Sequence, residues 1–162
     1  MRAAAKPLQF WHPASLVATF GGIGLLPYAP GTWGSLAALP LAWGLQLIGG
    51  PLLLLAASLA LFAVGWWAAG HYIRRHAMED PPAVVVDEVA AQWLVLVLMP
   101  LEPWRYLAAF LLFRLFDIVK PWPVNLADRT IKGGFGTMLD DVLAALYAGL
   151  GLLLLTYAWR IF

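Results

Sequence analysis

Cysteine is missing from this sequence of 162 residues. Its absence excludes disulfides, thiolate nucleophiles and cysteine-ligated metal centres. Charge is also scarce, because 12% of the residues are charged, whereas a soluble domain carries about 25%. The formal net charge of +1 provides no basic surface of the kind that binds nucleic acid, so we expect no nucleic-acid partner.

Apolar side chains are abundant instead and make up 62% of the chain. One soluble core of this length cannot bury so much apolar surface, so the composition predicts an integral membrane protein. The apolar segments span residues 36–48, 51–72, 88–99, 104–119 and 142–159. We therefore expect one domain over residues 1–162, an all-α polytopic bundle of four to five helices, with a turn at "GGP" (49–51).

The stretch before the first apolar segment, "GGIGLLPYAPGTWGSL" (21–36), is rich in glycine and proline. Irregular backbone at membrane depth is tolerated where it lies inside the protein or lines a cavity, so we expect a re-entrant segment here. Whether residues 36–48 cross the membrane or re-enter it stays open. Thr32, Gly34 and Ser35 precede that helix, and their N–H groups and hydroxyls could bind a phosphate. The alternative is a plain turn.

The basic residues predict an orientation. If the N-terminus is cytoplasmic, the bases divide unevenly between the two sides, in agreement with the positive-inside rule. The cytoplasmic set is Arg2, Lys6, Arg74, Arg75, Lys120, Arg129 and Lys132, and the outer set is Arg105 and Arg160. This topology places the charged ends of helices that are distant in sequence on one face of the bundle.

Acidic residues gather at those cytoplasmic ends. Carboxylates at membrane depth are costly and usually functional, and close carboxylates repel one another unless a cation or protons intervene. A donor set made of oxygen alone favours a hard ion such as Mg²⁺. Helix capping is the alternative, and it does not explain the second acid of each adjacent pair. The acids are Asp87, Glu88, Asp117, Asp128, Asp140 and Asp141.

Basic residues and glycines lie among these acids and suit a phosphate group. Arg114, three residues before Asp117 on the same helix face, could bind an anion or form a buried pair with that aspartate. The basic loop could instead meet anionic lipid headgroups. The candidate phosphate ligands here are Arg114, Lys120, Arg129, Lys132, Gly133 and Gly134. Taken alone, the residues predict a metal-dependent, phosphate-handling membrane enzyme, and they leave hydrolysis and transfer open.

Four motifs, in order, resemble the phosphatidylglycerophosphatase A family: "FGGIGLLPYAPGTWGSLAALP", "VDEVAAQW", "FRLFDIVKPWPV" and "DRTIKGGFGTMLDDVLA". The resemblance covers roughly residues 11–157. It implies a Mg²⁺-dependent lipid phosphatase of the bacterial inner membrane that converts phosphatidylglycerophosphate to phosphatidylglycerol. Ala91, Thr137 and Ala145 depart from the family pattern, and none of them removes a proposed ligand. The implied metal ligands are Asp87, Glu88, Asp117, Asp140 and Asp141, and the implied catalytic residues are Asp87, Glu88, Asp128 and Asp141.

We expect a mechanism in which water attacks the phosphorus and Asp128 or Glu88 accepts its proton. A covalent carboxyl-phosphate route stays open, as do the number of metal ions and the oligomeric state.

Two alternative functions belong to other classes of membrane protein. A CDP-alcohol phosphotransferase is disfavoured because its aspartate motif needs a "DG" dipeptide, which does not occur here. A small transporter or lipid-binding protein is disfavoured because the acids fall at helix ends rather than at the midplane.

Overall fold

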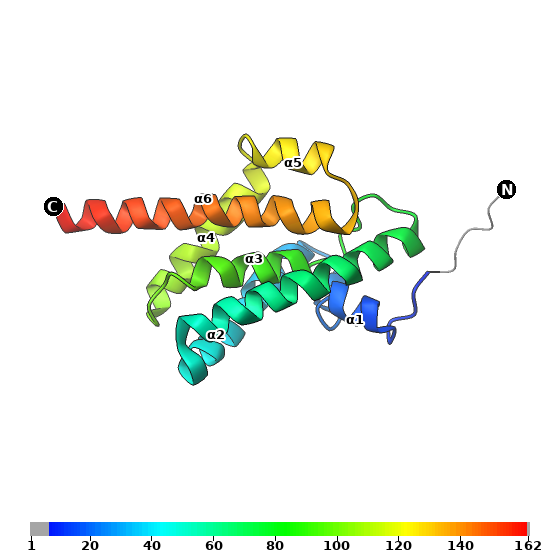
Figure 1. Cartoon of the computed structure of the whole chain (residues 1–162), viewed down its shortest axis with the longest axis horizontal. Coiled ribbons are helices and arrows are strands. Elements are labelled where there is room, and N and C mark those ends of the chain that lie inside the picture. Colours follow the sequence, from blue (N-terminus) through cyan, green and yellow to red (C-terminus); the bar gives the residue numbers. More distant parts are fainter. Residues whose placement is uncertain (1–6, 162) are drawn as a thin grey trace.

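The computed structural model describes residues 7–161, and side chains as far as residue 157. Over that range the chain is all helical (Figure 1), which confirms the predicted fold class. The elements are α1 (Pro13–Ala18), the 3₁₀ turn η1 (Ile23–Leu25), α2 (Pro30–His76), α3 (Val86–Leu96), α4 (Pro103–Val119), α5 (Val124–Thr130) and α6 (Gly133–Ile161).

Helix α2 is a hairpin of two arms that reverse direction at Gly50. This glycine has φ 67° and ψ −168°, a conformation that side chains with a Cβ disfavour. Pro51 follows and is the first residue of the second arm. Proline lacks a main-chain N–H, but at the first position of a helix that group would have no partner within the helix. Figure 1 shows the reversal at one end of the bundle. The predicted turn is therefore confirmed, and the two arms, α3, α4 and α6 are the five apolar helices that the sequence predicts.

Helix α3 is short and lies between the arms of α2 and helix α6. Its polar contacts fix its position along the bundle. Gln46 on the first arm and Ser58 on the second each donate a hydrogen bond of 2.8 Å to a main-chain carbonyl of α3. Trp93 of α3 donates in return to the carbonyl of Ala38 at 3.0 Å. Because buried polar groups need partners, these bonds hold α3 to both arms.

Helix α6 begins at Gly133, nine residues before the predicted start of the last apolar segment. The reason is close packing between helices. A Cβ at Gly134 would overlap the main chain of Gly70 and Trp66 on α2, so only glycine permits this crossing. Asp140 and Asp141 consequently lie roughly two turns inside α6, rather than at its opening.

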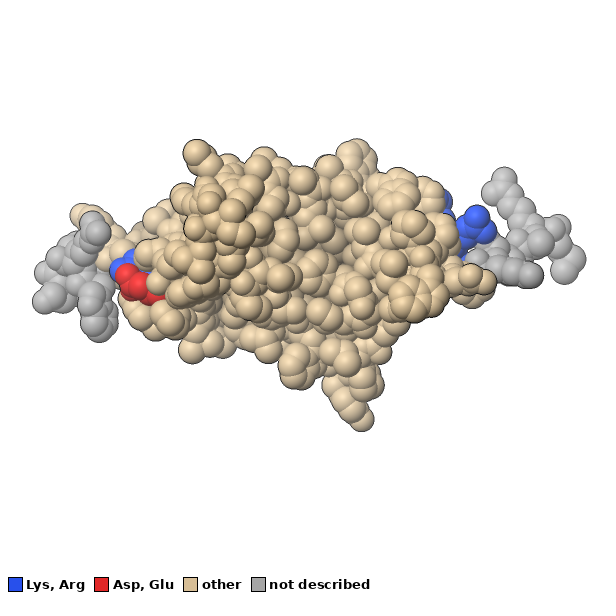
Figure 2. Space-filling model, turned by 90° about the horizontal axis from the view of Figure 1, so that it is seen from below, with Lys and Arg blue, Asp and Glu red and all other residues tan. Residues whose placement is uncertain are grey.

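Within the described part of the chain, two helices are long and apolar enough to cross a membrane: α2 over Pro30–His76 and α6 over Gly133–Tyr157. Only 11% of the most apolar window of α2 is buried within the protein, so this surface needs an apolar surrounding. Figure 2 shows one flank of the molecule without charge, and charged side chains only toward its two ends. Arg2 and Lys6, which support the predicted orientation, lie outside the described residues, as does the side chain of Arg160.

Candidate functional site

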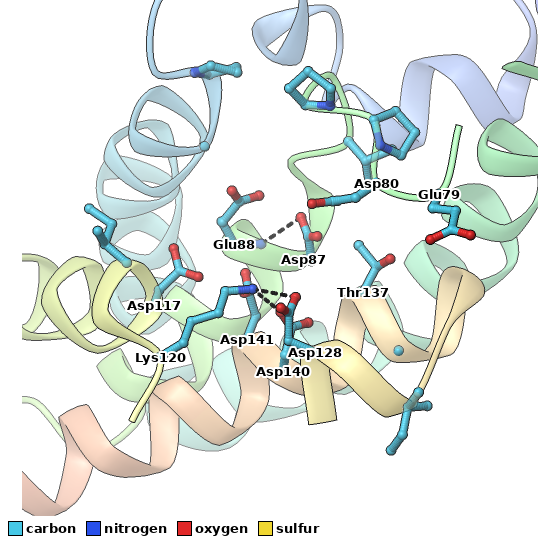
Figure 3. Close-up of a pocket in the computed structure, with 18 of the residues that line it drawn as sticks. Glu79, Asp80, Asp87, Glu88, Asp117, Lys120, Asp128, Thr137, Asp140 and Asp141 are labelled. Atoms are coloured by element: carbon cyan, nitrogen blue, oxygen red, sulfur yellow. Dashed lines mark hydrogen bonds and ion pairs between the residues drawn. The ribbon is translucent and has the colours of Figure 1, made fainter. Parts of the chain in front are cut away.

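A cavity of about 460 Å³ lies where the ends of several helices meet. The first turn of α2, the loop 77–85, the first turn of α3, the end of α4, helix α5 and the start of α6 all contribute to its lining. Figure 3 shows their acidic side chains around one shared space. The prediction that sequence-distant charged motifs meet at one face of the bundle is confirmed.

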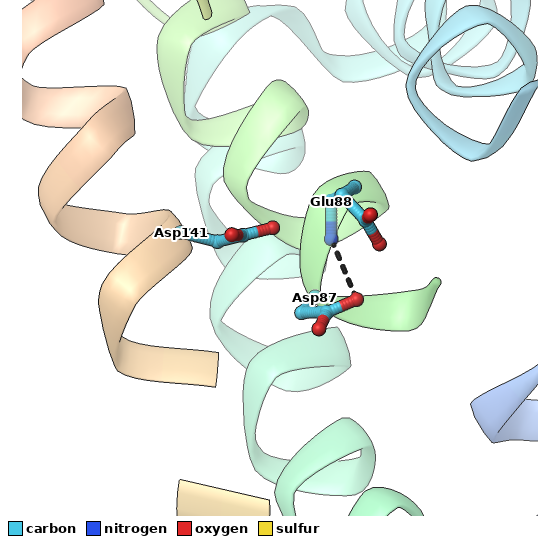
Figure 4. Close-up of side chains that lie close together, drawn as sticks. All are labelled: Asp87, Glu88 and Asp141. Carbon is cyan, nitrogen blue, oxygen red and sulfur yellow. Dashed lines mark hydrogen bonds between the residues drawn. The ribbon is translucent and has the colours of Figure 1, made fainter. Parts of the chain in front are cut away.

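Three carboxylates form the deepest part of this site (Figure 4). Asp87 and Glu88 stand in the first turn of α3, and Asp141 faces them from α6. One carboxylate oxygen from each lies within 4.8 Å of the other two. The main-chain N–H of Glu88 donates to Oδ1 of Asp87 at 3.0 Å. Oε2 of Glu88 and Oδ2 of Asp141 are buried and have no hydrogen-bond partner, so both oxygens are available to a ligand.

Lys120 joins three elements beside this carboxylate cluster (Figure 3). It ends α4 in the left-handed conformation, with φ 44°. Its Nζ donates to Oδ1 of Asp128 on α5 at 2.8 Å and to Oδ2 of Asp140 on α6 at 2.5 Å. Burial alone would lower the pKa of Lys120, but these two carboxylates outweigh it and raise that pKa. Burial likewise works against the charged form of Asp128, yet the hydrogen bond from Lys120 lowers its pKa.

Arg114 makes a second cationic contact with the acids of the site. Its Nη1 lies 2.7 Å from Oδ2 of Asp117 and 3.7 Å from Oε1 of Glu88. The same atom donates to the hydroxyl of Ser35 at 3.4 Å, and that hydroxyl donates to the carbonyl of Gly31 at 3.0 Å. The sequence left an anion ligand and a buried pair with Asp117 as alternatives for Arg114, and the structure shows the pair.

The remaining predicted phosphate ligands separate into two groups. Thr32, Lys132 and Gly133 line the cavity, together with Arg114 and Lys120. The others, which do not line it, are Gly34, Ser35, Arg129 and Gly134. Each of these has another environment: Gly34 packs against Val85, Ser35 is fully buried, Arg129 is exposed, and Gly134 lies at the crossing with α2.

Two features of the cavity were missed at the level of sequence. Glu79 and Asp80, in the loop after α2, line it. In the sequence they are an acidic pair directly before two prolines, a pattern that is typical of an ordinary loop. Gly31 lies so close to Glu88 that a Cβ at this position would overlap Oε1 of the carboxylate. The sequence shows only that Gly31 directly follows Pro30, which gave no hint of that contact.

The charge balance of the cavity bears on what can bind there. Among the described residues, eight acids and three bases line it. A phosphate ester would be repelled by this excess unless a cation bound first. The unpartnered buried oxygens of Glu88, Asp140 and Asp141 offer oxygen ligands of the kind that Mg²⁺ prefers. The acids are Glu79, Asp80, Asp87, Glu88, Asp117, Asp128, Asp140 and Asp141, and the bases are Arg114, Lys120 and Lys132.

The fold and the cavity define a class, namely a helical bundle with an apolar surface and a carboxylate-rich site that also contains three bases. Comparison with known proteins narrows the class. The family model for phosphatidylglycerophosphatase A matches residues 16–156. The chain therefore belongs to the phosphatidylglycerophosphatase A family, as its motifs predict, and it is an enzyme that hydrolyses phosphoric monoesters.

Three relatives align along most of their length. A phosphatidylglycerophosphatase A of Haemophilus influenzae is 39% identical over 144 residues, which are 88% of each chain. One of Escherichia coli is 32% identical over 157 residues, 96% of this chain and 91% of the relative. A Bacteroides thetaiotaomicron protein, provisionally named a phosphatidylinositol-3-phosphatase, is 42% identical over 140 residues, 82% of this chain and 87% of the relative. No solved structure gives a significant match.

Proposed function

We propose that the protein removes the terminal phosphate of phosphatidylglycerophosphate in a Mg²⁺-dependent reaction at the cytoplasmic face of the bacterial inner membrane. The observation that carries this proposal is the buried carboxylate cluster of Asp87, Glu88 and Asp141, in which one oxygen from each residue lies within 4.8 Å of the other two. Two buried oxygens of this cluster, Oε2 of Glu88 and Oδ2 of Asp141, have no hydrogen-bond partner. Family membership supports the lipid substrate.

The carboxylate cluster fits the metal ion that the family resemblance implies. Asp87, Glu88 and Asp141 would hold Mg²⁺ with oxygen ligands. When bound, the ion supplies a positive charge that offsets the charge of the phosphate oxygens. Asp117 and Asp140, the other two predicted ligands, face Arg114 and Lys120 in this structure. Their place in the metal shell stays a prediction.

The bases of the cavity would bind and orient the phosphate. The ammonium of Lys120 has three N–H donors, and two of them go to Asp128 and Asp140. The third remains for a phosphate oxygen. Lys132 donates to the carbonyl of Asp128 at 3.2 Å and lines the same cavity, close to the start of α6 at Gly133. Charge-assisted hydrogen bonds of this kind are the strong ones.

Proton transfer requires a carboxylate that can act as a base. In the reaction a water oxygen forms a bond to phosphorus and gives up a proton, the phosphorus–oxygen bond to the lipid glycerol breaks, and the leaving glycerol oxygen takes up a proton. Asp128 is a poor acceptor for the water proton, because Lys120 already engages it and lowers its pKa. Glu88 suits this role better, because it has two carboxylate oxygens: one could hold the ion while the other accepts the proton, and its Oε2 has no hydrogen-bond partner. We assign proton acceptance to Glu88.

The proposed orientation rests on the distribution of bases between the ends of the bundle. The described bases near the cavity end are Arg74, Arg75, Lys120, Arg129 and Lys132, while Arg105 lies at the start of α4, where that helix leaves the opposite end. Bases accumulate on the cytoplasmic side of membrane proteins. The site would therefore face the cytoplasm, and bacterial relatives support the inner membrane.

The test is release of inorganic phosphate from phosphatidylglycerophosphate in detergent micelles, with Mg²⁺ and then with EDTA. We expect activity that requires Mg²⁺ and falls about a hundredfold or more in Asp141→Asn, which keeps the side-chain volume but removes the charge. Glu102→Gln is the matched control, because it removes a carboxylate at the opposite end of α4, and it should change the rate less than about twofold.

Each result has a definite meaning. Release that survives EDTA would contradict the metal-dependent chemistry, and no release from folded, Mg²⁺-supplied protein would contradict the activity itself. Phosphatidylinositol-3-phosphate should be offered in parallel, because the Bacteroides relative carries that substrate in its name. Faster hydrolysis of this lipid would replace the proposed substrate while leaving the site unchanged.

A further inference from the structure

An apolar hollow of about 360 Å³ lies directly beside the charged cavity, at the start of α2. Its lining comprises Leu26, Pro27, Tyr28 and Trp33. The residues between these, 29–32, line the charged cavity. Residues 26–33 therefore contribute to both spaces: 29–32 line the carboxylate-rich cavity, and the residues on either side of them line the apolar hollow.

The side chains of this hollow are turned outward. Tyr28 is 82% exposed and Trp33 is 48% exposed, and Leu26 is exposed as well. Exposed apolar patches rimmed by polar groups mark contacts with lipid, ligand or protein. The neighbours of this patch along the chain, Pro30 and Thr32, line the charged cavity, so the patch adjoins the site.

A phospholipid substrate has to satisfy both environments at once. Its terminal phosphate must reach Lys120 and the carboxylate cluster, whereas its acyl chains gain nothing among eight acids and would desolvate them. The molecule must therefore leave the cavity over an apolar part of its rim. A second apolar hollow, lined by Leu16, Val17, Phe20, Gly21 and Leu61, shares no lining segment with the charged cavity. The start of α2, in contrast, places an apolar hollow next to the charged site.

We propose that the hollow formed by Leu26, Pro27, Tyr28 and Trp33 binds the acyl chains of the phospholipid substrate next to its glycerol backbone, and so sets the preference for a lipid over a water-soluble phosphate ester. The proposal rests on the proposed function, because it assigns the apolar part of that substrate. It commits to the substrate itself, rather than to bulk membrane lipid or to a partner protein.

The experiment compares two substrates in Trp33→Ala and Tyr28→Ala. One is phosphatidylglycerophosphate in mixed micelles, and the other is its deacylated, water-soluble counterpart. Since each variant removes a large apolar contact, we expect kcat/KM for the lipid to fall about tenfold, mainly through KM, while the value for the soluble ester changes less than about twofold. The dependence of kcat/KM on acyl-chain length should also become flatter.

Trp104→Ala is the control variant, because Trp104 is also exposed but lies at the opposite end of the bundle, at the start of α4. It should leave both substrates unaffected. An equal loss in Trp104→Ala would mean general membrane anchoring and would overturn the proposal. Equal loss of both substrates in Trp33→Ala, or no loss of lipid hydrolysis with an unchanged chain-length dependence, would overturn it too. If the wild type hydrolyses neither substrate, the proposed function itself fails.

Discussion

Replacing Gly31 with alanine tests how the carboxylate cluster is positioned. Gly31 lies in the first turn of α2, and a Cβ there would overlap Oε1 of Glu88 and stand 3.4 Å from Nη1 of Arg114. Because the obstacle is the end of a side chain, Glu88 can swing away while the helices stay in place. The substitution therefore moves the proposed proton acceptor without removing any charge from the site.

The expected magnitudes separate function from stability. Overpacking costs about 1–3 kcal/mol, and alanine recovers roughly 0.5–1 kcal/mol relative to glycine within a helix. The free energy of unfolding should therefore fall by only about 0–2.5 kcal/mol. A catalytic group displaced by about 1 Å can cost a hundredfold in rate. We expect Gly31→Ala to remain folded in detergent and to lose about a hundredfold in kcat.

Gly44→Ala is the matched control, since Gly44 lies on the same arm of α2 and a Cβ there meets nothing within 4 Å. It should leave the rate of phosphate release unchanged and raise the thermal unfolding temperature slightly. The assay is phosphate release at saturating Mg²⁺, with thermal unfolding in the same detergent. Full activity in a folded Gly31→Ala protein would refute the assignment of Glu88 and the contact on which the reasoning depends.

Two further substitutions probe the helix contacts around the site. Lys120→Met should abolish most phosphate release and lower the free energy of unfolding by about 1–3 kcal/mol, because it leaves Asp128 and Asp140 without their cation. Lys120→Arg should restore part of the activity and part of the stability. A Lys120→Met protein that is stable and active would contradict the role of this lysine. Gly134→Ala should lower the unfolding temperature in detergent by several degrees, because its Cβ would overlap the main chain of α2, whereas Gly149→Ala, with ordinary contact at 3.5 Å, should not.

The sequence predicted the helices well where apolar runs were long. It located the reversal at Gly50, because a glycine pair followed by proline excludes a continuous helix. It failed at the start of α6, because Gly133, Gly134 and Gly136 have low helix propensity and resemble a loop. The close crossing with α2 outweighs that propensity, and such a tertiary contact leaves no local pattern in the sequence.

For the site, the sequence predicted which residues come together but not how they pair. The convergence of Asp87, Glu88 and Asp141 followed from placing their helix ends on one side. The contact of Lys120 with Asp140 did not, because it depends on the left-handed cap of α4 and on where α5 packs against α6. The glycines predicted as phosphate ligands also depend on tertiary packing. Gly133 lines the cavity, whereas Gly134 lies at the crossing of α6 with α2.

The hydrogen bonds from both arms of α2 to α3 also limit how the enzyme can move. Asp87 and Glu88 lie on α3, which is held to the two arms of α2 by the hydrogen bonds of Gln46, Ser58 and Trp93. We therefore expect the backbone that carries Asp87 and Glu88 to stay in place during the reaction. A rearrangement that admits a lipid headgroup or releases phosphate would then come from other parts of the cavity lining, such as the loop 77–85 and helix α5.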